Sequence, residues 1–170
     1  GLDRVNKRVL CRQRPPVPYD LLSINIGSTP QLRQVPGAAE NAVAVKPIQR
    51  FNDRWLALLD RVQHHAGKLT IAVVGAGAGG VELLLAMQFR LRNELQKLAR
   101  NQGDLVFHLF TDGPDILPTH SAGVRGRFDS VLAERGVLVH RNAGVTHVFP
   151  GRLQTATGEL LTTDEIVWVT

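Results

Sequence analysis

The sequence predicts an α/β fold in which a central parallel sheet is combined with an antiparallel β-meander. Two apolar runs, at residues 69–74 and 104–110, are separated by a long amphipathic run at 81–100. This pattern is typical of a strand–helix–strand unit, whose two strands lie parallel. Further along, residues 144–161 form short alternating segments separated by Pro-Gly and Thr-Gly turn signals, which predict the meander.

The turn after the first of these strands carries three glycines at G-x-G-x-x-G spacing, which is a dinucleotide-binding motif when it lies between a strand and a helix. Gly75 permits the tight turn, Gly77 lets a pyrophosphate approach the backbone, and Gly80 lets the helix pack close to the strand. The free N–H groups at the helix start and the helix dipole also favour phosphate. We therefore expect a Rossmann-like, three-layer NAD(P)-binding domain. Its predicted pyrophosphate-binding residues are Gly75, Ala76, Gly77, Ala78, Gly79 and Gly80.

The same glycine turn has other interpretations. It could serve the backbone geometry alone, or it could bind S-adenosylmethionine in a methyltransferase. A methyltransferase would have an acidic residue soon after a shorter helix and no meander, so residues 144–161 argue against it. A third alternative is a non-catalytic module in which the nucleotide only signals or supports assembly.

Shorter elements are predicted before the glycine turn. We expect a short hairpin or strand within residues 1–17, a second strand over 19–26 and a turn at 27–30. A loop is expected over residues 31–45. Residues 47–65 carry apolar side chains at three- and four-residue spacing, which predicts an amphipathic helix.

Beyond the strand–helix–strand unit, residues 111–118 are expected to form a loop. Residues 121–135 are predicted to form an amphipathic helix that ends at Gly136. Strands are expected at 137–140 and 164–170.

The composition limits the class of protein and its location. The chain has 170 residues, of which 44% are hydrophobic and 21% charged, as in an ordinary globular domain. No apolar run approaches the length of a membrane span and no signal peptide is visible, so we expect no transmembrane segment. The single cysteine, Cys11, excludes a disulfide within the chain and fits a reducing setting, so we expect a cytoplasmic location.

The charge pattern and the histidines predict neither nucleic acid nor metal as a ligand. The net charge is +5, and the basic residues near the start of the chain have no interleaved aromatic residues for base stacking. His64 and His65 lack the cysteines or clustered carboxylates that a metal site needs. No serine lies in a G-x-S-x-G elbow, so no hydrolase nucleophile is assigned and the catalytic residues stay unknown.

The order of these segments resembles the two-dinucleotide-binding-domain flavoproteins of the pyridine nucleotide–disulfide oxidoreductase superfamily. The resemblance covers nearly the whole chain. It is carried by residues 19–30, Pro36-Gly-Ala-Ala39, the glycine segment 73–82, Ile116-Leu-Pro118 and Val167-Trp-Val-Thr170. Two further segments, 45–48 and 117–120, are most similar to the NADH-dehydrogenase-like branch, particularly proteins fused to selenide, water dikinase.

This resemblance implies that the chain is a fragment of a larger enzyme. Residues 1–46 would be the C-terminal part of the first FAD-domain segment and the crossover, and residues 47–170 the NAD(P)-binding domain. The intact protein would be an FAD-dependent NAD(P)H oxidoreductase, in which hydride passes from nicotinamide to flavin. Its partners would be a nicotinamide dinucleotide and the remaining FAD domain. The fragment alone is expected to bind NAD(H) without turnover.

The resemblance also assigns a position to the residue that binds the adenosine ribose. In the family an acidic residue usually ends the second strand, and here that position is Thr111, with Asp112 next to it. Asp112 follows Gly75 by 37 residues rather than the usual gap of about 20, because the glycine helix is long. Asp112 either binds the ribose or forms a turn before Gly113. No arginine directly follows to hold a 2′-phosphate, which favours NAD over NADP.

Two more residues are assigned to cofactor binding. Glu82, early in the glycine helix, either complements the helix dipole or faces the nicotinamide, as the resemblance implies. Gly27 lies in the glycine-to-proline turn of the segment that is similar to an FAD-domain strand.

Overall fold

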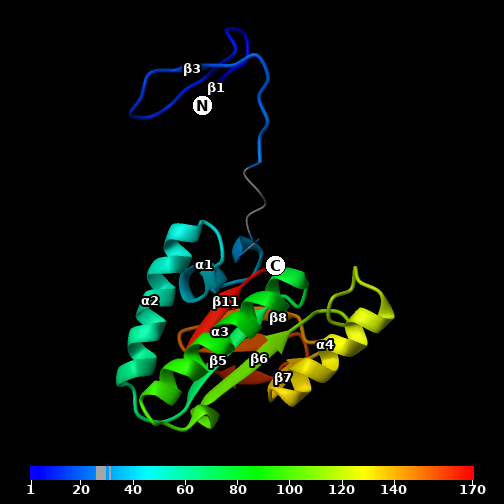
Figure 1. Cartoon of the computed structure of the whole chain (residues 1–170). Coiled ribbons are helices and arrows are strands. Elements are labelled where there is room, and N and C mark those ends of the chain that lie inside the picture. The colour runs from blue at the N-terminus through cyan, green and yellow to red at the C-terminus, as the bar shows by residue number, and fades with distance from the viewer. Residues whose placement is uncertain (26–29, 31) are drawn as a thin grey trace.

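The structure, a computed structural model, describes residues 1–25, 30 and 32–170. Its centre is a five-stranded parallel sheet with helices on one face and a small antiparallel sheet on the other (Figure 1). The strand order is β4-β11-β5-β6-β7. The strands span Val43–Ala44 (β4), Glu165–Trp168 (β11), Leu69–Val74 (β5), Leu105–Phe110 (β6) and Val137–His140 (β7).

Three helices cover the face of the sheet that is turned to the viewer in Figure 1. They are α2 (Ile48–His64), α3 (Ala78–Lys97) and α4 (Ala122–Glu134). In the part of the chain that the structure describes, no helix has the length and apolarity needed to cross a bilayer.

The opposite face is covered by the antiparallel meander. Its strands are β8 (Val145–Phe149), β9 (Arg152–Thr155) and β10 (Leu160–Thr162), in the order β10-β9-β8. Alternate side chains of β5 therefore enter two different cores: Ile71 packs with the helices, whereas Ala72 packs with the meander. This period of two is why β5 is apolar along its whole length.

The predicted fold class is confirmed. The strands expected at 69–74, 104–110 and 137–140 are β5, β6 and β7, and they pair in parallel. The helix predicted over 47–65 is α2, and the expected meander is β8 to β10. Gly136 follows α4 with a φ of 67°, the left-handed conformation that commonly ends a helix.

The strand predicted over residues 19–26 was wrong for the residues that the structure describes, because 19–25 form no regular secondary structure. The chain pairs earlier, at β3 (Val17–Pro18). Leu21 is 92% and Ile24 is 63% exposed, so neither side chain has the packing that would support a strand. Gly27 and the rest of the predicted turn, apart from Pro30, lie outside the described residues.

The loop predicted over residues 31–45 was also wrong, because it contains a 3₁₀-helix at Leu32–Gln34, helix α1 at Ala38–Asn41, and β4. Strand β4 forms because its two residues pair in parallel with the end of β11, more than 100 positions away. Helix α3 begins at Ala78 rather than at 81, because its first turn includes two of the glycines.

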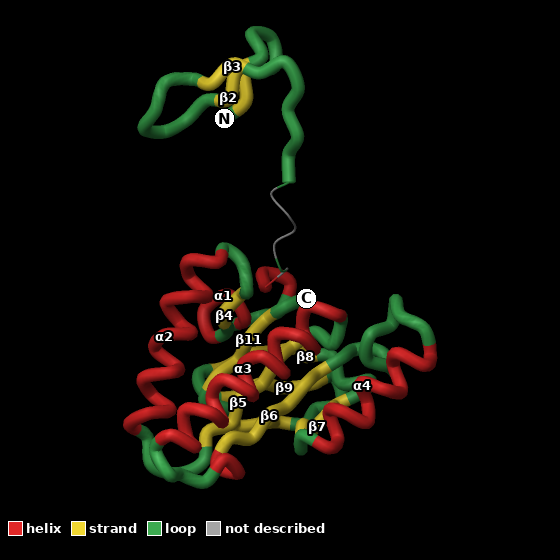
Figure 2. Tube along the Cα trace, viewed as in Figure 1, coloured by secondary structure: helices red, strands yellow, loops and turns green. Residues whose placement is uncertain are grey.

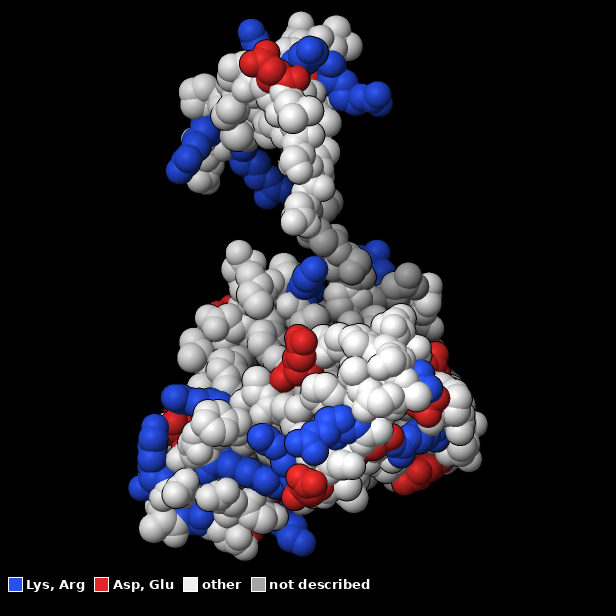
Figure 3. Space-filling model, turned by 45° about the vertical axis from the view of Figure 1, so that its right-hand side comes forward, with Lys and Arg blue, Asp and Glu red and all other residues white. Residues whose placement is uncertain are grey.

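A second antiparallel sheet, formed at the start of the chain, stands apart from the central sheet (Figure 2). It comprises β1 (Leu2–Asp3), β2 (Arg8–Val9) and β3. The short hairpin or strand predicted within residues 1–17 is thus a three-stranded sheet whose last strand extends to Pro18. Lys and Arg side chains are spread over it in Figure 3. The basic residues of this sheet and its turns are exposed to solvent: Arg4, Lys7, Arg8, Arg12 and Arg14.

The segment between this sheet and α2 packs with the central domain. Helix α1 lies against β8, and β4 is an edge strand of the central sheet. In packing terms these residues therefore belong with the central sheet. A boundary after residue 46 between FAD-domain and NAD(P)-binding segments of a longer protein stays a prediction.

A buried carboxylate joins the central sheet to α2. The side chain of Glu165, at the start of β11, is 2% exposed, and Arg54 and Arg61 of α2 donate to its two oxygens at 2.7 and 2.5 Å. Arg61 also donates to the carbonyl oxygen of Asp164 at 3.1 Å. Because a buried charge is costly without partners, these contacts hold α2 along the sheet.

Replacing Arg61 with alanine should lower the free energy of unfolding by about 2–3 kcal/mol, because the buried Glu165 carboxylate loses one of its two partners. Urea denaturation would measure the change. Arg50→Ala is the matched control on the same helix, since Arg50 is exposed, and it should change the free energy by about 0.5 kcal/mol or less. Equal effects of the two substitutions would contradict the role of Arg61.

A histidine pair lies on the meander face of the central sheet. Nδ1 of His108 in β6 lies 2.8 Å from Nε2 of His140 in β7, and the His140 ring stacks on Phe110 at a centroid distance of 4.3 Å. Burial lowers the pKa of both histidines, and the charge of His140 lowers the pKa of His108 further, while Glu159 acts in the opposite direction on both. Both rings are therefore held in the neutral form near neutral pH.

This pair should make the protein less stable as the pH falls. The unfolded histidines gain protons near pH 6.5, about their ordinary pKa, whereas the folded pair does so only at lower pH. The free energy of unfolding should therefore decrease from about pH 7 to about pH 5, a range above the titration of ordinary carboxylates. In a His108→Phe/His140→Phe double variant, denaturation should show that the free energy of unfolding changes less with pH. The control variant His65→Gln, at an exposed position, should keep the pH dependence of the unaltered chain.

Candidate functional site

The glycine turn brings the end of β5 close to the start of α3 and to the last residue of the chain. Gly75 has a φ of 112°, and a Cβ there would lie 3.0 Å from the backbone nitrogen of Thr170. A Cβ on Gly80 would lie 1.7 Å from the carbonyl oxygen of Gly75. The positive φ at residue 75 favours glycine there. The close packing of α3 on β5 requires glycine at residue 80, because any Cβ would clash with the Gly75 carbonyl oxygen.

The start of α3 opens onto free space. Gly77 is the N-cap of the helix, and a Cβ built on it would have no atom within 4 Å among the described residues. The first N–H groups of a helix have no acceptor within the helix, and Gly77 has no side chain to cap them. The N–H groups of Ala78, Gly79 and Gly80 can therefore bind an anion, which the helix dipole favours.

The loop after β6 is tied to this turn. The N–H of Leu117, a buried residue with a φ of 50°, donates to the carbonyl oxygen of Ala76 at 2.8 Å. Thr111 is also buried, and its hydroxyl accepts from the N–H of Gly113 at 3.3 Å. Asp112, by contrast, is exposed. Of the two residues at the ribose position, Asp112 is thus the one with a side chain available to a ligand.

A cavity of about 770 Å³ lies at the carboxyl ends of the parallel strands. Val74, Phe110 and Trp168, the last residues of β5, β6 and β11, line it. From β5 the chain continues to β6 and β7 on one side, whereas β11 and β4 lie on the other, so the strand order reverses at β5. Ligands of open α/β sheets bind at this switch point.

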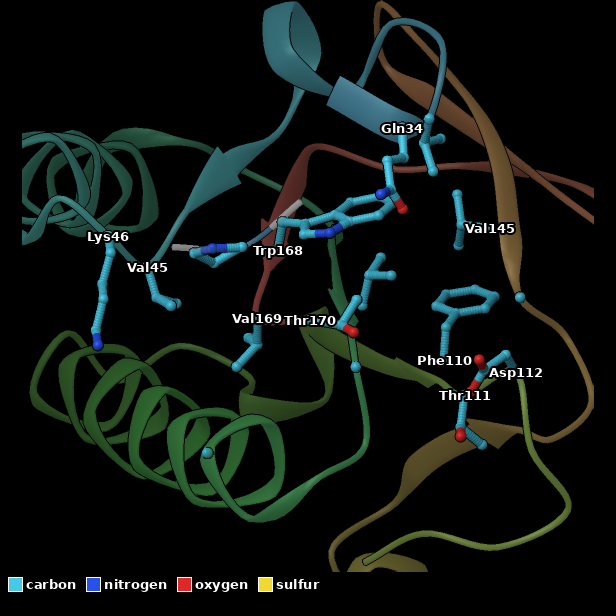
Figure 4. A pocket seen from close by; sticks show the side chains of 16 residues that line it. Gln34, Val45, Lys46, Phe110, Thr111, Asp112, Val145, Trp168, Val169 and Thr170 are labelled. Carbon is cyan, nitrogen blue, oxygen red and sulfur yellow. The ribbon is translucent and has the colours of Figure 1, made fainter. Parts of the chain in front are cut away.

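The cavity has groups of opposite charge at its two ends (Figure 4). Asp112 lies beyond β6 at one end, and Lys46, after β4, lies at the other. Trp168 and Thr170 lie between them, and Gln34 points inward from the segment before α1. Gly75 of the glycine turn and Gly79 at the start of α3 also line the cavity, so a long ligand could contact both ends and the start of α3 at once.

The family model for pyridine nucleotide-disulphide oxidoreductase matches residues 1–170. The chain belongs to this family. It is 28% identical over 168 residues to a NADH dehydrogenase-like protein of Bacillus subtilis, YutJ, covering 99% of this chain and 43% of that protein. It is 27% identical over 175 residues to a type II NADH:quinone oxidoreductase of Haemophilus influenzae, covering 89% of this chain and 39% of that protein. The chain therefore spans less than half the length of these relatives.

Solved structures of related fold are also larger than this chain. NDH2 of Plasmodium falciparum in complex with NADH matches with a TM-score of 0.73 and 20% identity, over 99% of this chain and 36% of that one. The sulfide:quinone oxidoreductase of Aquifex aeolicus matches with a TM-score of 0.66 and 17% identity, over 99% of this chain and 40% of that one. At these identities the likeness shows the fold alone.

The superfamily inferred from the sequence is thus confirmed, whereas the fusion to selenide, water dikinase stays a prediction.

Of the predicted site residues, Gly75, Gly79, Thr111 and Asp112 line the cavity. The side chains of Ala76 and Ala78 pack into the core on the helical side instead. Three others lie among the described residues, and Gly27 lies outside them. Gly77 has the open face described above, and Gly80 contacts the Gly75 carbonyl. Glu82 is exposed on the second turn of α3 and does not line the cavity.

Several residues of the cavity wall were missed by reasoning from the sequence. Phe110 and Trp168 read as ordinary strand residues, although their place at the carboxyl ends of strands could have marked them. Gln34 lies in the segment 31–45 that was expected to be a loop, and Lys46 follows that segment directly. Neither was named as a candidate site residue. Gly144 was seen only as part of the meander.

Alanine substitutions at Gly80 and Gly77 should distinguish a glycine that close packing requires from one that faces open space. Gly80→Ala should lower the free energy of unfolding by about 3 kcal/mol, because its Cβ would meet the Gly75 carbonyl oxygen and α3 would have to shift. Gly77→Ala should cost less than about 1 kcal/mol, because its Cβ enters open space and only the N-cap preference is lost. Chemical denaturation would test this order, and a larger loss for Gly77→Ala would contradict the geometry.

Proposed function

We propose that the chain is the NAD(P)H-binding part of an FAD-dependent oxidoreductase, similar to the NADH dehydrogenases among its relatives. The observation that carries the proposal is the open face of Gly77 at the start of α3. The neighbouring Gly75 and Gly79 line a cavity that continues to Asp112. The matching relatives named as NADH dehydrogenase-like and as NADH:quinone oxidoreductase support it, as does the NADH complex of one structural neighbour.

The residues present fit a dinucleotide. A volume of about 770 Å³ lies within the range of about 300–1,000 Å³ that is usual for ligand sites. A side chain at Gly77 would fill space beside the helix N–H groups, and its absence leaves a place for phosphate. The N–H groups of residues 78–80 would hold the pyrophosphate, and the Asp112 carboxylate would accept hydrogen bonds from ribose hydroxyls.

The position of Asp112 also sets the direction in which the dinucleotide would lie. With the adenosine ribose at the end of β6, the nicotinamide would lie toward β11 and β4. There the apolar side chains of Val45, Trp168 and Val169 line the cavity and would exclude water from the ring. When bound, the nicotinamide would supply a hydride to the flavin of the intact enzyme.

Several parts of this proposal go beyond the family assignment. They are the preference for NAD over NADP, the FAD of the longer protein and its remaining domain as partner, the inactivity of this chain alone, and a cytoplasmic location. A non-catalytic module with the same nucleotide remains the alternative. The methyltransferase alternative loses its support, because the family match covers residues 1–170.

Replacing Gly77 with valine should strongly weaken NADH binding, because the side chain would occupy the space beside the helix N–H groups. Isothermal titration calorimetry with NADH would measure it, and affinity should fall by about a hundredfold or more with the loss of the pyrophosphate contacts. Gly126→Val is the matched control: a Cβ on Gly126, in α4, also meets no atom within 4 Å, and this residue does not line the cavity.

The Gly126→Val variant should bind NADH as the unaltered chain does. Unchanged binding by Gly77→Val, with a melting temperature close to that of the control, would refute the proposed nucleotide site. Absence of NADH binding by the unaltered chain would do the same. Flavin absorbance of the longer protein would separate an oxidoreductase from a non-catalytic module.

A further inference from the structure

The connection between β7 and β8 holds the loop that carries Asp112. The N–H of Thr111 donates to the carbonyl oxygen of His140 at 3.0 Å, and the N–H of Ala143 donates back to the carbonyl oxygen of Thr111 at 2.9 Å. On the other side of Asp112, the carbonyl oxygen of Gly113 accepts from the N–H of Asn142 at 2.9 Å. The backbone is thus fixed on both sides of the carboxylate.

Within this connection, Gly144 lies directly against Asp112. A Cβ on Gly144 would lie 3.2 Å from the Cβ of Asp112 and 3.6 Å from its Cα. The first distance is shorter than the optimal carbon–carbon separation of about 3.5–4.0 Å, so one of the two residues would have to move. Gly144 is held in place because its carbonyl oxygen accepts from the N–H of Ala156 at 2.8 Å, in the meander.

We propose that Gly144 is a positioning residue that sets cofactor preference: the space left by its missing side chain lets Asp112 stand where its carboxylate accepts hydrogen bonds from the adenosine ribose. This inference rests on the proposed function and adds a determinant of the preference for NADH over NADPH. It involves a residue 32 positions after Asp112 in the sequence.

The physical reason is the different demand that the two nucleotides make on the carboxylate. Ribose hydroxyls donate hydrogen bonds to Asp112 only within narrow limits of distance and angle, so a shift of a few tenths of an ångström weakens them. The 2′-phosphate of NADPH is repelled by the same carboxylate rather than bound. A methyl group on Gly144 should therefore weaken the binding of NADH much more than that of NADPH.

The test is calorimetric titration of the chain and its Gly144→Ala variant with NADH, NADPH and reduced nicotinamide mononucleotide, which lacks the adenosine. NADH affinity should fall about tenfold, the loss expected for weakened hydrogen bonds to a charged group. The other two affinities should change by about twofold or less. Gly126→Ala, in α4 and away from the cavity, should leave all three unchanged.

A second comparison asks whether Gly144 acts through Asp112, because Gly144 itself lines the cavity and a methyl group could touch the ligand. In an Asp112→Ala background, Gly144→Ala should cause no further loss of NADH affinity, since the group it positions is absent. An equal loss in both backgrounds would overturn the inference.

A pair of variants at Asn142 tests the same contact if Gly144→Ala does not fold. Asn142 has a φ of 51°, which glycine adopts freely and a β-branched residue does not. Asn142→Val should therefore reproduce the selective loss of NADH affinity, whereas Asn142→Gly should not, with melting curves recorded for both. Unchanged NADH affinity in folded Gly144→Ala and Asn142→Val variants would overturn the inference. Failure of the unaltered chain to bind NADH would instead refute the proposed function on which it rests.

Discussion

The close contact between α3 and the end of β5 is the constraint on which the other features of the site depend. A side chain on residue 80 would clash with the carbonyl oxygen of Gly75, so α3 can pack this close to β5 only with glycine at residue 80. The contact brings the first N–H groups of α3 to the edge of the sheet where the parallel strands end. The candidate site for an anion is thus a consequence of how tightly a helix packs on a strand.

The same turn anchors elements from distant parts of the chain. The N–H of Gly75 donates to the carbonyl oxygen of Phe110 at 3.0 Å, and Ala76 accepts from Leu117. Val169 donates to the carbonyl oxygen of Val74 at 2.9 Å, which brings the last residues of the chain against Gly75. The end of β6, the loop after it and the end of β11 are therefore fixed to one short segment, and together they form the cavity wall.

Reasoning from the sequence predicted the parts of the fold that depend on local pattern. The period of apolar residues predicted α2, and the glycine spacing predicted the turn between β5 and α3, because these signals act over a few residues. Strand β4 could not be predicted in this way, since only its pairing with the distant β11 makes it a strand. The strand predicted over residues 19–26 shows the opposite case. The composition there favours a strand, but the described residues pair earlier, at β3.

The candidate site also combines a part set by local sequence with a part set by distant residues. Its phosphate end is specified within residues 75–80, where each glycine has a local geometric reason that the sequence reveals. Its proposed ribose end depends on distant residues. Asp112 lies in a loop whose backbone is held by residues 140–143, and the Asp112 side chain lies beside Gly144. The sequence around Asp112 could therefore not distinguish a turn-forming aspartate from a ribose-binding one. The two ends are also held by different segments. On the proposed function, a change in the β7–β8 connection would therefore affect the Asp112 end and leave the glycine turn intact.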